Sequence, residues 1–535
     1  MLSSFFRLAH LAIILLSVGG FCFFYWCMSY QELAVWYKQI NPFFYNSKFW
    51  ETELFTPAVK LAGNWWCGVA LSFAGVVGWL GWKMKLPKLT WKIPSRNSIA
   101  EYVSICAIGT TISLAVNWGT IYTSDEVFSA TNFASLPFFQ TISNYPKPNN
   151  HLLFNALNKL LFFWSDDLVF TGRLISLAFY NLTLCATWIY LKKWKLANLL
   201  KCLILLAMAV QFPVLGFSWQ ARGYEMVLFF SMLSFISLMD YLENGNNSKL
   251  ILHSICNIAG IFTLPSYLYW WASLGLAAML YQIYQRELKL NYLKTTAIAI
   301  AASLISYLPL LCFSGIASLT ENKYVAGEKV TKWHFLTHLN DRHYFEGLFS
   351  EWFCAPNTVL FIGIAAILLP ILFLTFKQIK AKHQAVGVVS ISMVLSFLAM
   401  SIFLVRLPYY RNLLAHGYLF LLLAFICLAI SISSKIGQYI LGASLLFFVA
   451  FSVKTNLARL PNDLYYYHVQ HEYEKAQSIQ VDIDTQKPIY LDYEDFYWWY
   501  LLRQRYDGQH LLILPNRTRE DFENISSNQG PFQTK

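Results

Sequence analysis

The sequence predicts an all-α polytopic membrane protein with about thirteen transmembrane helices. Of its 535 residues, 57% are hydrophobic and only 13% are charged, and the mean hydropathy is +0.44. A water-soluble protein of this length needs more charge to cover its surface. The 43 Phe, 32 Tyr and 19 Trp residues also suit repeated crossing of the membrane interface, because amphipathic rings favour the headgroup level.

Apolar runs of about 20 residues mark the individual spans, because a helix needs that length to cross the hydrocarbon core. We expect the spans at 8–28, 59–82, 99–121, 168–190, 197–216, 223–241, 249–267, 268–284, 295–313, 356–376, 386–405, 413–432 and 437–453. The pair at 249–284 requires a tight hairpin at Pro265 and the aromatic run Tyr267 to Trp271. The first span lacks a small-residue cleavage site after it, so we expect a retained anchor.

Basic residues predict the orientation of these spans. The formal net charge is +11, and Lys and Arg residues cluster in four connections, at 83–96, 192–195, 286–294 and 377–382. Alternating spans place all four on one face, which the positive-inside rule makes cytoplasmic. The positive charge is therefore a topology signal, and we expect no nucleic-acid partner. The ten Cys residues show no CxxC pair and no Cys/His metal spacing, so a disulfide framework is not expected.

The opposite face carries the long loops 122–167 and 314–355 and a tail from about Lys454. With the N-terminus cytoplasmic, this face is extracytoplasmic, and we expect the function there. The expected parts are two helices with a basic loop at 1–98, a main transmembrane module at 99–453, and an extracytoplasmic lobe at 454–535. Within the lobe, 488–493 and 510–515 look like short strands flanking a helix, which suggests a small α/β unit. The polar end after Ile525 is expected to be disordered.

Two adjacent acids open the first long outer loop, in the stretch Thr123-Ser124-Asp125-Glu126-Val127-Phe128. A carboxylate at the lip of an apolar bundle persists with a cationic or hydrogen-bonding partner. Arg222, between the fifth and sixth spans, and Arg406 and Arg411, before the twelfth, lie on the same face. A carboxylate can act as a general base, and guanidinium groups bind phosphate oxygens. Together these residues suit transfer of a group from a lipid phosphate at the membrane surface.

Each of these residues also has a structural explanation. The acidic pair would serve about as well as a solvated loop cap, and the arginines would anchor helices at the interface. His151 is more typical of a helix start than of a ligand or base, and it opens an amphipathic segment, 151–164, that suits a helix lying in the interface. Asp166 and Asp167 invite a metal hypothesis, but Asp ahead of a span is equally an N-cap, and we favour the cap.

Four features in this order resemble the integral membrane GT-C glycosyltransferases. They are the acidic pair, a surface helix opened by Lys147-Pro148-Asn149-Asn150-His151, the outer turn Ala221-Arg222-Gly223-Tyr224 and the late turn Pro408-Tyr409-Tyr410-Arg411. The sequence is most similar to the protein O-mannosyltransferases and lipid A aminoarabinose transferases, over 99–453 and most strongly over 121–226.

The resemblance implies a sugar donor on a polyprenyl phosphate (undecaprenyl or dolichyl phosphate) and an extracytoplasmic acceptor, which is a protein, a lipid or a glycan. It makes 99–453 the catalytic module of an inverting enzyme in the lipid bilayer, most naturally the bacterial inner or cell membrane. Asp125 would be the catalytic base, supported by Glu126. Donor-phosphate contacts would come from Arg222, Arg406, Arg411 and Lys147, and the candidate substrate contacts are His151, Tyr224, Tyr409 and Tyr410. No metal site is expected, and the lipid-linked donor is the one cofactor-like group implied; Asp125 and Glu126 could bind a divalent cation, but the sequence offers no support for one.

This chain departs from the family in two places. Many relatives have a Pro-Pro pair where it has Asn149-Asn150-His151, and the spans at 8–28 and 59–82 have no assigned counterpart.

Two other functions remain open. A lipid-linked oligosaccharide ligase or polymerase would use a pyrophosphate carrier and Arg and His residues of a late outer loop; 314–355 contains His334, His338, Arg342 and His343. A non-enzymatic transporter of polyprenyl lipids would place charges and broken helices at mid-bilayer. In this sequence the informative charges gather at one rim, which favours the transferase.

Overall fold

The structure is a computed structural model that describes residues 2–40, 54–83, 95–146, 149–161, 164–165, 167–321, 331–338, 344, 347–348, 384–432, 434–459, 489–492 and 511–514. Almost all of these residues lie in helices or in their short connections. The sequence-predicted span at 356–376 lies outside the described residues. The other predicted spans fall on helices.

The first half of the chain alternates long helices with short ones. The long helices are α1 (Leu2–Cys27), α3 (Pro57–Lys83), α4 (Arg96–Asn117), α8 (Leu168–Lys192) and α11 (Tyr224–Asn244). The shorter ones are α2 (Tyr30–Ile40), α5 (Ser124–Ser129), the π-helix η1 (Ala130–Ala134), α6 (Phe138–Ser143), α7 (Leu152–Leu161), α9 (Asn198–Ala209) and α10 (Phe212–Phe217).

The second half continues with α12 (Asn247–Thr263), α13 (Tyr267–Tyr284), α14 (Leu290–Ser306), α15 (Leu308–Phe313), α16 (Ala317–Thr320), α17 (Lys332–Thr337), α20 (Gln384–Leu404), the 3₁₀ helix η3 (Tyr410–Leu413), α21 (Leu414–Ser431) and α22 (Lys435–Arg459). The predicted hairpin at 249–284 is confirmed as α12 and α13, which are separated by the residues around Pro265.

Two predicted spans are each divided in two. The span expected at 197–216 breaks between α9 and α10, and the span expected at 295–313 breaks between α14 and α15. Pro213 and Pro309 stand in the first turn of α10 and of α15. Proline has no N–H for the preceding helix and clashes with its carbonyls, so it starts a new helix more easily than it continues an old one.

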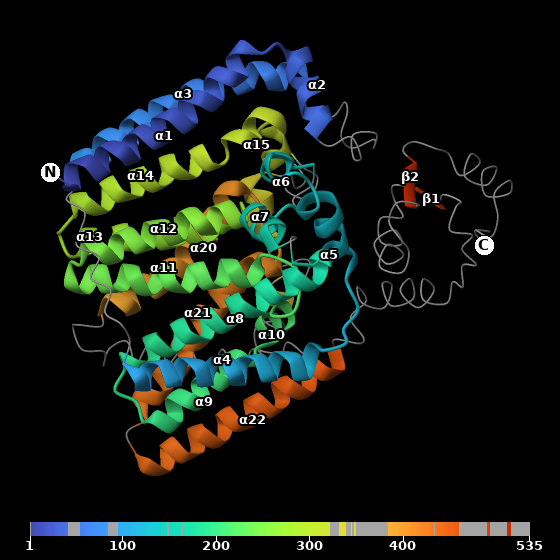
Figure 1. The fold of residues 1–535 in the computed structure, drawn as a ribbon. Helices are drawn as coiled ribbons and strands as arrows, with labels where there is room; N and C mark the ends of the chain where they lie inside the picture. Colours follow the sequence, from blue (N-terminus) through green and yellow to red (C-terminus); the bar gives the residue numbers. More distant parts are fainter. Residues whose placement is uncertain are drawn as a thin grey trace.

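The long helices lie side by side (Figure 1), with α1, α3, α14, α12, α11, α8 and α4 as successive packed neighbours. Helices α13 and α20 pack together, as do α9 and α22, and α21 contacts α11 and α9. Within the part of the chain that the structure describes, six helices are long and apolar enough to cross a membrane: Pro57–Trp79, Arg96–Asn117, Leu168–Lys192, Tyr224–Asn244, Tyr410–Ser431 and Lys435–Ala458. The total of thirteen spans stays a prediction.

The short helices α5, α6, α7, α10 and α15 gather at one end of the bundle, on the right in Figure 1, and α2 lies at that same end. Basic residues lie at the opposite ends of the long helices, where Lys193 and Lys249 flank Asp240 with Nζ-to-carboxylate distances of 3.7 and 3.8 Å. The separation of basic connections from the α5–α7 loop agrees with the predicted arrangement of faces.

The bundle core is dense in aromatic residues. Tyr180, Phe235, Tyr267, Trp270 and Tyr418 are all buried in one hydrophobic cluster formed by α8, α11, α13 and α21. This core packs together the helices that lead to the polar residues described next.

In the tail, β1 (Ile489–Asp492) and β2 (Leu511–Leu514) pair in parallel, with Ile489 opposite Leu511. The two short strands predicted there are confirmed. The helix predicted between them and the residues after Ile525 lie outside the described residues, so the α/β lobe and the domain limits at 98 and 453 stay predictions.

Candidate active site

Helix α5 fixes the two adjacent acids. Its N-cap, Thr123, accepts the Glu126 N–H through Oγ1, and the Glu126 carboxylate accepts the Thr123 N–H at 2.8 Å. Threonine and glutamate three residues apart complete this reciprocal capping box. Successive helix residues point about 100° apart, so Asp125 and Glu126 face different surroundings.

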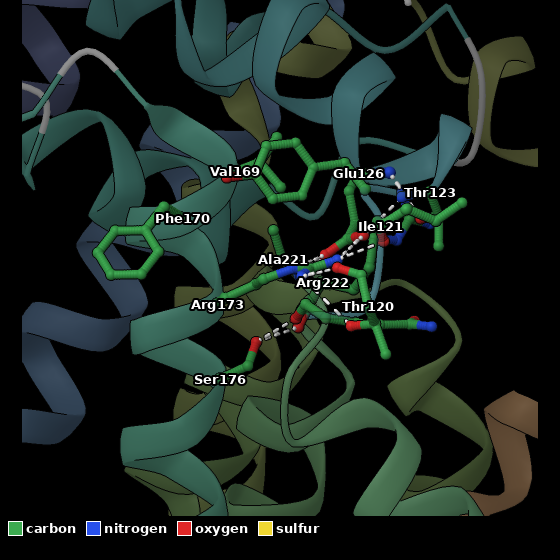
Figure 2. Close-up of polar contacts among 12 residues, drawn as sticks. Thr120, Ile121, Thr123, Glu126, Val169, Phe170, Arg173, Ser176, Ala221 and Arg222 are labelled. Carbon is green, nitrogen blue, oxygen red and sulfur yellow. Dashed lines mark hydrogen bonds and ion pairs between the residues drawn. The ribbon is translucent and has the colours of Figure 1, made fainter. Parts of the chain in front are cut away.

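Glu126 is completely buried and binds Arg173 of α8 (Figure 2). Arg173 Nε and Nη2 donate to Glu126 Oε1 and Oε2 at 2.8 and 2.9 Å. The Ala221 N–H donates to Oε1 at 2.7 Å, so with Thr123 the carboxylate has four N–H donors. A buried ion pair is stable when the remaining hydrogen-bonding positions are satisfied. Glu126 therefore joins α5, α8 and the turn at 220–222.

Arg173 also holds the end of the α4–α5 connection. Its Nη1 and Nη2 donate to the carbonyls of Thr120 and Ile121, each at 2.8 Å, and its guanidinium lies 4.8 Å from the centre of the Tyr122 ring. Burial, together with the Asp167 carboxylate that accepts the Tyr122 hydroxyl at 2.6 Å, raises the pKa of Tyr122. Residues 120–122 of the connection that leads to Asp125 are thus bound to Arg173 of α8 and to its N-cap, Asp167.

The turn that carries Arg222 is also set by α8. The Ser176 hydroxyl donates to the carbonyls of Gln220 and Arg222, at 2.5 and 3.1 Å. Gly172 approaches so closely that a Cβ there would lie 2.7 Å from the Cβ of Ala221. A larger residue at 172 would push the turn away from the helix.

Asp125 faces Asn149 and two arginines. Asn149 Nδ2 donates to Asp125 Oδ1 at 3.0 Å, and Oδ2 lies 4.0 Å from Arg222 Nη2 and 3.7 Å from Arg411 Nη1. The Asp125 side chain is 29% exposed, whereas that of Glu126 is fully buried. Asp125 is therefore the acid of the pair that another molecule can reach.

Arg222 supports the loop around Asp125 from inside. Its side chain is 3% exposed, Nη1 donates to Ser129 Oγ at 2.8 Å and to the Asp125 carbonyl at 3.3 Å, and Nη2 donates to Asn149 Oδ1 at 2.6 Å. Asn149 thus accepts from Arg222 and donates to Asp125. This side-chain bridge sets the orientation of the Asp125 carboxylate.

Arg411, at the start of α21 in η3, is the accessible cation of the cluster. Its side chain is 44% exposed, and its guanidinium carbon lies 6.0 Å from the centre of the Tyr224 ring, with that of Arg222 5.8 Å from the same centre. An aromatic ring attracts cations at its face. Tyr224 therefore helps to keep two like charges near one another.

His151 is buried and accepts the Gly223 N–H at Nδ1, at 2.7 Å. The neutral ring then carries its proton on Nε2, which lies buried with no hydrogen-bond partner among the described residues. Burial, followed by the charges of Arg222 and Arg411, lowers the pKa of His151 well below its usual value. The ring meets Tyr224 edge to face, with centroids 5.0 Å apart. His151 is thus a neutral packing residue beside the site.

The remaining predicted site residues are placed less centrally. Arg406 follows α20 and lies near Tyr269 of α13. Tyr409 is half exposed with its ring 5.5 Å from the Arg411 guanidinium, and Tyr410 packs against Tyr344 with ring centroids 5.0 Å apart. Lys147 lies outside the described residues.

Asp167 is the N-cap of α8, as predicted, because its carboxylate accepts the N–H groups of Val169 and Phe170 at 3.2 and 2.9 Å. Asp166 lies outside the described residues. Across the described ranges no group of three or more His, Cys, Asp or Glu residues is arranged to hold a metal ion.

Two residues of the site were missed by the sequence analysis. Arg173 carries a charge into the first turns of an apolar span, and such a charge demands a partner, so this signal was available. Asn149 offered no such signal, because its role depends on a contact with Asp125, 24 positions earlier.

No family model and no curated protein matches this sequence. Among solved structures, the fold is similar to that of ArnT from Cupriavidus metallidurans bound to undecaprenyl phosphate, with a TM-score of 0.50 and 11% sequence identity over 81% of this chain and 89% of that one. The apo state of the same protein gives a TM-score of 0.47 and 10% identity over the same shares. The arabinosyltransferase EmbB from Mycobacterium smegmatis gives 0.42 and 12% identity over 77% of this chain and 45% of that one.

The chain thus shares its overall fold with ArnT. This agrees with the fold that the four sequence features predicted, and the six long apolar helices of the described residues support an integral, multi-pass membrane protein. Within this fold, the α5–α7 loop, the turn before α11 and the η3 turn before α21 carry the cluster of Asp125, Asn149, Arg222 and Arg411.

Proposed function

We propose that this protein is a membrane glycosyltransferase that transfers a sugar from a polyprenyl-phosphate donor to an acceptor on the extracytoplasmic face, with Asp125 as the catalytic base. The observation that carries the proposal is a partly exposed carboxylate beside two arginines at one end of a GT-C fold. The undecaprenyl phosphate bound to ArnT supports a lipid phosphate as the carrier of the sugar.

The proposed reaction is a single displacement at the anomeric carbon. The acceptor oxygen or nitrogen forms the new bond to that carbon while the bond from the carbon to the phosphate oxygen breaks, and the acceptor proton passes to the Asp125 carboxylate. Attack from the side opposite the phosphate inverts the configuration. Because a phosphate is a good leaving group without protonation, one carboxylate is sufficient, in contrast to the two of a glycoside hydrolase.

The two arginines have different parts in this reaction. Arg411 is exposed, and its Nη1 lies 3.7 Å from Asp125 Oδ2. A donor phosphate bound to Arg411 would therefore stay close to Asp125, and the guanidinium would offset the negative charge that develops on the leaving phosphate. Arg222 donates hydrogen bonds to Ser129, Asn149 and the Asp125 carbonyl, so it positions the loop and adds buried positive charge near Asp125. Glu126 and Arg173 hold α5 and do not touch the substrate.

The orientation follows the basic residues. We place the α5–α7 loop outside the cytoplasm and the Lys193, Asp240 and Lys249 end inside it, in a bacterial inner membrane with the N-terminus cytoplasmic.

The test uses membranes that contain the chain, a native acceptor fraction and a lipid-linked sugar donor. Release of polyprenyl phosphate from a monophosphate donor should depend on the chain and be lost in Asp125→Asn. Turnover of pyrophosphate donors alone would replace the proposal with the ligase hypothesis. Lipid translocation without acceptor, unchanged in Asp125→Asn, would replace it with the transporter hypothesis.

A further inference from the structure

Helix α2 lies at the same end of the bundle as the candidate active site (Figure 1). Two hydrogen bonds join α2 to α6. The Tyr37 and Ser143 hydroxyl oxygens are 2.9 Å apart, and Gln140 Nε2 donates to the Tyr37 carbonyl at 2.8 Å. All three side chains are buried. The N-terminal helices have no assigned counterpart in the family, and through α2 they contact the segment between Asp125 and Asn149.

An aromatic cluster surrounds these bonds. Phe313, the last residue of α15, stacks on Tyr37 and Phe55 with centroids 4.6 and 5.0 Å away, and meets Phe139 of α6 edge to face at 5.4 Å. Aromatic pairs of this kind stabilise beyond the area they bury. The cluster therefore fixes α2, α6 and α15 against one another.

Ser314, which follows Phe313 in the chain, also binds the C-terminal end of α6. The Ser314 hydroxyl donates to the Ser143 carbonyl at 2.7 Å and accepts the Tyr145 N–H at 2.9 Å. Ser143 is thus held through its hydroxyl by α2 and through its carbonyl by the chain after α15.

From α6 the contacts continue to Asp125. Asn150, completely buried, donates through Nδ2 to the carbonyls of Thr141 and Asn144 at 2.9 and 2.6 Å. The adjacent residue is Asn149, whose amide donates to Asp125. The position of Asn149, and with it the direction of the Asp125 carboxylate, therefore depends on where the C-terminal end of α6 lies.

We propose that α2 is a positioning element of the enzyme, in which Tyr37 holds α6 so that Asn149 orients Asp125 for proton transfer. This inference rests on the proposed function. Tyr37 touches no substrate and acts through α6, Asn150 and Asn149. Its contribution should appear in the rate of the chemical step, because the contacts that continue from α6 lead to Asn149 and Asp125, the residues proposed for proton transfer.

The experiment compares Tyr37→Phe with Tyr30→Phe in the full-length protein in lipid nanodiscs. Tyr30 is the matched control, because it lies in the same helix and donates its hydroxyl to the Phe55 carbonyl at 3.2 Å, inside the N-terminal helices. Loss of one buried hydrogen bond at Tyr37 should lower kcat about fivefold and leave the donor KM unchanged. Tyr30→Phe should keep both values.

A second readout does not need activity. Backbone amides of 141–145 and 149–151 should exchange hydrogen faster in Tyr37→Phe than in the unmodified protein, and at the unmodified rate in Tyr30→Phe. If the two variants behave alike in kcat and in exchange, the inference is overturned. If Asp125→Asn retains full turnover, the proposed function fails, while the exchange comparison still decides whether α2 orders α6.

Discussion

Glutamine at position 126 removes the negative charge that Arg173 faces. The carboxylate is fully buried and accepts four N–H groups, and glutamine keeps one oxygen while its NH₂ opposes the donors. The Arg173 side chain is 3% exposed, so its charge stays away from water. Breaking a buried pair on one side costs about 3–5 kcal/mol. We expect about 3 kcal/mol, because the carbonyls of Thr120 and Ile121 continue to accept from Arg173.

The assay is unfolding of the purified protein in mixed micelles, followed by tryptophan fluorescence as denaturant is added. The matched control is Asp125→Asn, one residue away. Its side chain is partly exposed, and asparagine still offers an oxygen to Asn149 Nδ2, so its free energy of unfolding should stay within about 1 kcal/mol of the unmodified value. The two adjacent acids should therefore respond differently: Glu126→Gln lowers the free energy of unfolding, whereas Asp125→Asn lowers turnover and leaves stability nearly unchanged.

A double variant separates the ion pair from its surroundings. Arg173→Met alone leaves Glu126 buried without its cation, whereas Glu126→Gln with Arg173→Met removes both charges. The losses of unfolding free energy in Glu126→Gln and in Arg173→Met should therefore sum to clearly more than the loss in the double variant. Additive costs, or a Glu126→Gln protein as stable as the unmodified one, would refute the assignment of this pair as the structural support of α5.

Three further predictions concern residues around the cluster. Arg411→Ala should raise the donor KM about 10- to 100-fold with little loss of stability, and an unchanged KM would remove Arg411 from the phosphate site. The unfolded chain takes up a proton at His151 near pH 6.5 and the folded chain does not, so this residue should lower the free energy of unfolding by about 1.4 kcal/mol between pH 7.5 and 5.5. The His151→Asn protein should lose that pH dependence. An unfolding free energy that falls with pH equally in both proteins would contradict the prediction. Gly223→Ala would place a Cβ 2.7 Å from Thr263 Cγ2 and should lower the free energy of unfolding by about 1–3 kcal/mol in the same assay. Adding Thr263→Ser removes that methyl group and should restore part of the loss. A double variant no more stable than Gly223→Ala would argue against the close contact.

The sequence predicted the helices well because span length and apolar composition are local properties. It missed the breaks at Pro213 and Pro309, where a proline inside an apolar run starts a new helix while hydropathy stays high. The hairpin at Pro265 was predicted from that same residue type together with the need to fit two spans.

The site was predicted less completely, for reasons of distance along the chain. The sequence placed Asp125, Arg222 and Arg411 on one face, and the structure brings these three side chains together. It could not predict that Glu126 turns inward, because that depends on Arg173, 47 positions later, and on the Ala221 N–H. The burial of His151 likewise depends on Gly223, which is distant in sequence. The catalytic role of Asp125 stays a prediction.

The most direct test of that role is the rate of sugar transfer by Asp125→Asn, measured per folded molecule with saturating donor and acceptor. Asparagine preserves the side-chain volume and the oxygen that faces Asn149, but it cannot accept the acceptor proton. Loss of a general base typically costs 100- to 10,000-fold, so we expect polyprenyl phosphate release to fall about 1,000-fold while the unfolding curve is unchanged. Release within about tenfold of the unmodified rate would contradict the assignment of Asp125 as the catalytic base.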